Sequence, residues 1–80
     1  MLVWVRVPSD DRFVSHIGMP ADPNMKAAEL LDKAREVWGL STEKPYQLIR
    51  LHASGQQPVY LGRTLQENGI RDGDPLDVIG

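Results

Sequence analysis

The sequence predicts an α+β domain in which one main helix packs across a mixed β-sheet, in the order strand, strand, helix, strand, strand, strand. Three observations predict it: alternating apolar residues near the N-terminus, apolar residues at helical spacing in the middle, and a tight turn followed by renewed alternation near the C-terminus. We expect residues 1–80 to form a single domain, since a chain of 80 residues buries only about 60% of its unfolded surface and encloses one modest core.

Two strands are predicted first, at residues 2–7 and 12–19, where β-branched and aromatic residues are frequent. The segment 8–11 between them contains proline, serine and aspartates, which predicts a hairpin turn. Successive side chains of a strand point to opposite faces. We therefore expect the three valines of the first strand to face the core, and Trp4 and Arg6 to lie on the exposed face.

The helix is predicted to begin with Asp22 as its N-cap and Pro23 at its first position, and to end before Gly39. Apolar residues recur at helical spacing between these limits: Ala27, Leu30, Leu31, Ala34, Val37 and Trp38. Charged residues occupy the other side. We expect the apolar side to lie on the sheet and the charged side to face water.

The third strand is predicted at residues 46–53. Alternation within it suggests that Ile49 and Leu51 point inward, while Arg50 and His52 point outward. This assignment places two aliphatic side chains in the core and two basic side chains in solvent.

The last two strands follow turn-forming residues. A turn at 54–57 leads to a short strand at 58–61, whose initial proline indicates an edge position. The Asp-Gly-Asp turn at 72–74 precedes a final strand in which Leu76 and Val78 face inward. Because a crossover through the helix joins parallel strands, we expect a later strand to pair in parallel with the first.

Composition disfavours several classes of partner. The formal net charge is −2, the isoelectric point is about 5.5, and the basic residues are scattered, so neither nucleic acid nor an anionic membrane is expected to bind. The chain has no cysteine, no apolar run long enough to span a bilayer, and no signal peptide pattern. We expect a cytoplasmic protein without direct membrane insertion.

The sequence contains no recognisable catalytic constellation, such as a nucleophile elbow or a phosphate-binding glycine loop. Ser15 and His16 are neighbours in a predicted strand, so their side chains point to opposite faces. Two isolated histidines, His16 and His52, do not predict a metal site. We expect neither enzymatic activity nor a cofactor.

The most specific pattern lies near the C-terminus and comprises Gly62, Thr64, Leu65, Ile70, Gly73, Leu76 and Val78. These residues resemble the Gly-x-Thr-Leu turn and the approach to the last strand of the ubiquitin-like superfamily. The resemblance covers essentially the whole chain and implies a ubiquitin-like β-grasp fold. The Arg-Asp-Gly-Asp-x-Leu segment and the Ile-Arg-Leu sequence at 49–51 look most like the small bacterial YukD-like or EsaB-like proteins, which are associated with type VII secretion.

Two departures from ubiquitin bear on function. Ubiquitin-like modifiers end in a flexible tail with paired glycines, whereas here strand residues are predicted through Ile79 and leave only Gly80. In ubiquitin, an exposed apolar residue of the third strand lies in the patch that most partners bind. The matching position here is predicted to be Arg50, flanked by Leu48 and His52, so the ubiquitin-binding surface is not expected.

The resemblance therefore implies a noncatalytic module for protein–protein interaction, acting as an accessory or regulatory protein of a type VII-like secretion system. Its predicted protein-binding residues lie on the sheet face: Trp4, Arg6, Leu48, Arg50, His52 and Ile79. Trp4 equally fits a structural role in covering the neighbouring strand. Two alternatives remain: a protein modifier conjugated through Gly80, and the ubiquitin-like domain of a larger protein.

Overall fold

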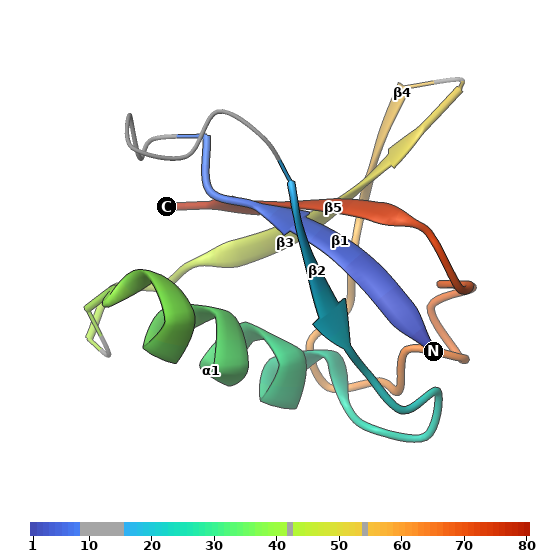
Figure 1. Ribbon diagram of the computed structural model, residues 1–80, viewed down its shortest axis with the longest axis horizontal. Helices are drawn as coiled ribbons and strands as arrows, with labels where there is room; N and C mark the ends of the chain where they lie inside the picture. The colour runs from blue at the N-terminus through green and yellow to red at the C-terminus, as the bar shows by residue number, and fades with distance from the viewer. Residues whose placement is uncertain (9–15, 42, 54) are drawn as a thin grey trace.

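One helix packs on a five-stranded mixed sheet in the computed structural model, which describes residues 1–8, 16–41, 43–53 and 55–80 (Figure 1). This arrangement confirms the predicted α+β class. The elements are β1 (Leu2–Arg6), β2 (Ile17–Pro20), α1 (Ala27–Trp38), β3 (Gln47–His52), β4 (Gly55–Pro58) and β5 (Pro75–Ile79).

The sheet has the strand order β2-β1-β5-β3-β4, so the first and last strands of the chain lie side by side at its centre (Figure 1). β1 and β5 pair in parallel, with Val5 opposite Leu76. This pairing confirms that a later strand lies parallel to the first, and it identifies that strand as the last one. The other three pairings are antiparallel. β1 is therefore paired along both edges, with β2 on one side and β5 on the other, and these pairings fix which of its side chains face the helix.

The core lies between α1 and one face of the sheet. Val3, Val5 and Val7 are fully buried, as predicted from their alternation. α1 turns most of its predicted apolar side toward them, and the buried residues of the helix are Ala27, Leu30, Leu31, Ala34 and Trp38. Val37 was predicted on this side as well, but it is exposed. Each fully buried aliphatic side chain contributes about 1.5–3 kcal/mol to folding, so this layer holds most of the stability of the domain.

The helix begins later than its local sequence predicted. It starts at Ala27, and Asp22 instead accepts a hydrogen bond from the backbone N–H of Asn24 at 2.8 Å in a local turn. The N–H of Ala27 donates to the backbone carbonyl of Arg63 at 2.9 Å. A distant segment thus satisfies the start of the helix, and no side-chain cap is needed. The predicted end is confirmed: Gly39 has a left-handed φ of 64°.

β4 also differs from its prediction. It spans Gly55–Pro58, where a turn followed by a strand at 58–61 was expected. Because this edge strand is exposed along its whole length, it needs no apolar alternation, and its polar residues resembled a turn. Residues 12–15 of the predicted second strand, and Ser15 with them, lie outside the described residues; the remainder of that strand is confirmed as β2.

Candidate functional site

Figure 1 shows α1 on one side of the sheet, and we call the opposite side the open face. Strand register assigns its members: Leu2, Trp4 and Arg6 on β1, Gly18 and Pro20 on β2, Gln47, Ile49 and Leu51 on β3, Gln56 and Pro58 on β4, and Pro75, Asp77 and Ile79 on β5. Three of the five exposed large hydrophobic residues in the described chain are here, namely Leu2, Trp4 and Ile79, with exposed fractions of 38%, 41% and 37%.

An ion cluster around the buried carboxylate of Asp77 lies in the middle of this face. Arg6 donates from Nε to Asp77 Oδ1 at 3.1 Å and from Nη2 to Oδ2 at 2.8 Å. His16 Nε2 lies 3.2 Å from the same Oδ1. Asp77 is only 2% exposed, although α1 packs on the other side of the sheet. A carboxylate can be buried there because two basic side chains surround it.

The cluster also changes the proton affinity of its arginine. The hydrogen bond to Asp77, and then the negative charge of that carboxylate, raise the pKa of Arg6 above its ordinary value. Arg6 therefore carries its charge at every physiological pH.

The structure places Trp4, Arg6 and Ile79 on the open face, as predicted, but it reverses the predicted faces of β3. Leu48 is 1% exposed and lies opposite Val78 in the core, so it cannot contact a partner. Ile49 and Leu51, expected inside, belong to the open face. Three of the four residues at 48–51 are apolar, so alternation fits both registers, and pairing with β5 decides between them.

Arg50 and His52 follow Leu48 on the helix side of the sheet. The guanidinium of Arg50 lies with its Nε 3.1 Å from Asp74 Oδ2, and its side chain is 18% exposed. His52 is exposed at the end of β3, where it pairs with Gly55. The predicted outward position of Arg50 at the centre of a binding patch is therefore wrong, and Ile49 occupies that place.

The sequence did not identify Ile49 and Leu51 as apolar residues of the open face, nor Asp77 as the anion of its ion cluster. One signal was available, because Asp77 stands between the inward residues Leu76 and Val78 and must therefore face the same side as Trp4 when β5 pairs with β1. Its partner Arg6 lies 71 residues away in the chain, and no local pattern joins the two.

Gly80, the residue of the alternative conjugation reading, follows β5 directly and packs against the ring of Tyr46. A Cβ atom at this position would overlap that ring, which is 9% exposed. The preceding residue, Ile79, is paired with Gln47. Close packing is thus a sufficient reason for glycine at this position.

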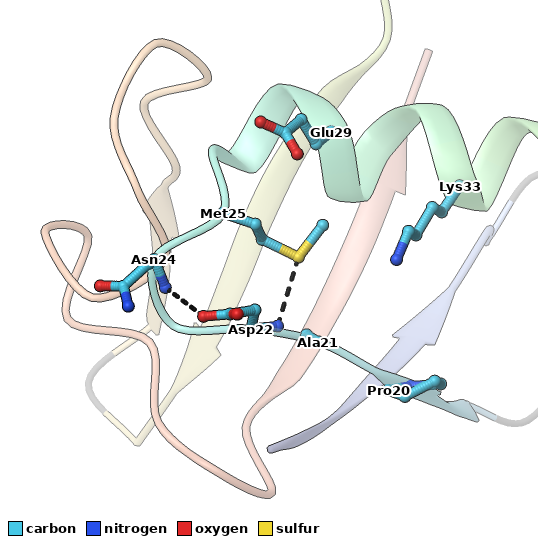
Figure 2. A pocket seen from close by; sticks show the side chains of 7 residues that line it. All are labelled: Pro20, Ala21, Asp22, Asn24, Met25, Glu29 and Lys33. Carbon is cyan, nitrogen blue, oxygen red and sulfur yellow. Dashed lines mark hydrogen bonds between the residues drawn. The ribbon is translucent and has the colours of Figure 1, made fainter.

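A groove of about 530 Å³ lies between the end of β2 and the start of α1 (Figure 2). It is lined by Pro20, Ala21, Asp22, Asn24, Met25, Glu29 and Lys33. Asp22 forms hydrogen bonds with two other lining residues. Its N–H donates to Met25 Sδ at 3.4 Å, and its carboxylate accepts the N–H of Asn24. The other two charged side chains of the lining, Glu29 and Lys33, come from α1.

Within the described residues, no group of three or more histidine and acidic side chains could hold a metal ion. The one helix described there is too short and too polar to cross a bilayer. Comparisons with models of known protein families and with curated proteins find no match to this chain. The open face is therefore the feature on which a functional proposal can rest.

Proposed function

We propose that this protein is a noncatalytic interaction module with a ubiquitin-like β-grasp fold, which binds another protein through its open face. The observation that carries the proposal is the exposure of Leu2, Trp4 and Ile79 on the open face, which also holds the ion cluster of Arg6, His16 and Asp77. The parallel pairing of β1 with β5 at the centre of the sheet supports the fold.

Uncovered faces of antiparallel and mixed sheets usually carry polar side chains. Here Ile49 and Leu51 of β3 extend the apolar row toward β4 and are partly exposed. Several exposed apolar residues on one face are typical of binding sites in otherwise polar proteins. Trp4 is the largest side chain in the row, and tryptophan is enriched among residues that dominate binding energy.

The two edges of the sheet argue for docking through side chains and against addition of a partner strand. Met1 and Ala21 exchange two backbone hydrogen bonds, so the backbone of Pro20 points away from β1 toward the free edge. The N–H of Val59 donates to the carbonyl of Leu48, which leaves Pro58 directed outward at the opposite edge. A proline at each edge removes a donor that an added strand would need.

A retention experiment with two matched variants tests the proposal. Trp4→Ala removes the largest exposed side chain of the open face, and Val37→Ala removes an exposed apolar side chain of α1. Proteins from the native cells that are retained by the wild type and by Val37→Ala should be lost with Trp4→Ala. If all three forms retain the same proteins, the open face is not the binding surface.

The resemblance to YukD-like and EsaB-like proteins extends the proposal to a cytoplasmic accessory role in a type VII-like secretion system. Genes for secretion ATPases and small helical substrates beside the gene for this protein would support this role. Genes for an activating enzyme and a deconjugating protease would support a modifier instead.

A further inference from the structure

The charge that the open face presents to a partner is basic. The side chains of Arg6 and His16 are 33% and 24% exposed, whereas that of Asp77 is 3% exposed. Among the described residues of this face there is no other ionisable side chain. The cluster as a whole is close to neutral, but its negative member is covered, so a partner meets the guanidinium and the imidazole.

Arg6 retains donors for a second carboxylate. Asp77 uses Nε and one hydrogen of Nη2, while both hydrogens of Nη1 and the other hydrogen of Nη2 have no partner among the described residues. The bond to Asp77 also holds the guanidinium in one orientation. An arginine fixed in this way loses little side-chain entropy when it binds another oxyanion.

Apolar residues stand on both sides of this guanidinium. Trp4 precedes it by one position of the same face on β1, while Ile49 and Ile79 lie beyond Asp77 on β3 and β5. A partner that packs on these side chains excludes water from Arg6. A charge-assisted hydrogen bond is stronger in such a desolvated setting than at an open surface.

We propose that the partner segment carries an aspartate or glutamate side chain that binds Arg6, between apolar side chains that pack on Trp4 on one side and on Ile49 and Ile79 on the other. In the complex, Arg6 bridges two carboxylates, that of Asp77 below and that of the partner above. This inference rests on the proposed function, because it specifies the chemistry of a partner for the open face.

Selection of random displayed peptides on the wild-type protein tests the inference without knowledge of the natural partner. Peptides whose binding depends on the open face are identified by their loss with Trp4→Ala. They are then measured against the double variant Arg6→Gln with Asp77→Asn. This variant removes both charges together and leaves no unpaired carboxylate, and its thermal unfolding is recorded to confirm that it folds.

The expected result is that these peptides share an acidic residue between apolar ones. Replacing that residue by its amide should weaken binding to the wild type about tenfold, as loss of a charge-assisted bond does, and should leave binding to the double variant unchanged. If peptides depend on Trp4 but carry no acidic residue, or bind the double variant as tightly as the wild type, the carboxylate inference is wrong and the docking function stands. If no peptide depends on Trp4, both proposals fail.

Discussion

The two sides of the sheet bury their residues by different means. On the side that α1 covers, Val3, Val5 and Leu76 are fully buried by apolar packing. On the open face, the best buried residue is a carboxylate, Asp77, and the apolar residue Trp4 nearby remains 41% exposed. Burial on the first side stabilises the fold. The second side combines a fixed polar centre with available apolar surface, which is the composition of a recognition surface.

Truncating neighbouring residues of β3 that face opposite sides is expected to give the largest difference. Leu48→Ala should lower the free energy of unfolding by about 2–5 kcal/mol, because it leaves a cavity in the core. Ile49→Ala, on the open face, should cost markedly less because its side chain is already partly exposed. Urea unfolding of both variants measures the difference. Equal losses would contradict the assignment of the two faces.

The ion cluster gives the next largest effect. Asp77→Ala leaves Arg6 and His16 without their shared anion and should destabilise the protein by about 1–3 kcal/mol. The double variant Arg6→Gln with Asp77→Asn should lose less, since no partner is left unpaired. Chemical denaturation of the three proteins tests this order. A fully stable Asp77→Ala protein would show that the cluster does not hold the open face together.

Acid should weaken the turn that joins Thr64 and Glu67, and this effect on stability should be smaller than the preceding ones. Its carboxylate accepts the N–H of Thr64 at 3.0 Å, while the Thr64 hydroxyl accepts the N–H of Glu67 at 3.0 Å, forming a capping box. These bonds lower the pKa of Glu67 below its ordinary value of 4.5. The carboxylate therefore stabilises the fold fully above that pH, and the contribution disappears as the pH falls through the folded-state pKa.

Glu67→Gln is the matched control, because glutamine also accepts the Thr64 N–H but does not titrate. The melting temperature is measured at neutral pH and at a pH below the ordinary carboxyl pKa. The drop between the two pH values should be smaller for the variant than for the wild type. Identical acid dependence in the two proteins would exclude Glu67 as a contributor.

The smallest effect is expected at Gly80. If the open face performs the function noncovalently, the tagged protein recovered from its native cells under denaturing conditions should run as a single band of unconjugated mass. Deletion of Gly80 should not change this band. A ladder of heavier species that disappears with the deletion would move the function from the open face to the C-terminus.

The sequence predicts a feature of this structure when the residues that determine it are close together in the chain, and fails when they are far apart. The valines of β1 alternate without ambiguity, and their faces followed directly. Apolar residues at 48, 49 and 51 fit two registers, and only pairing with β5 separates them. Asp22 has the chemistry of an N-cap, yet the carbonyl of Arg63 supplies the acceptor for the helix start from far along the chain. Local patterns cannot contain such information.

Separation along the chain also limits how much of the candidate site the sequence predicts. Trp4, Arg6 and Ile79 were identified because their own strands alternate clearly. Arg50 was misplaced together with the register of β3, and Asp77 was missed because its partner is 71 residues away. Residues that need one strand for their placement could be predicted, whereas those that need a neighbouring strand could not.

The central position of β5 has a consequence for biosynthesis. β5 follows β1 and β3 in the chain and lies between them in the sheet, so during synthesis β1 and β3 each have an unpaired edge until residues 75–79 emerge from the ribosome. Nascent chains with unpaired edges are the species that aggregate or recruit chaperones. We therefore expect aggregation to be most frequent when translation stalls before β5. Once residues 75–79 have emerged, β5 should pair with both β1 and β3 and close the sheet in one late step.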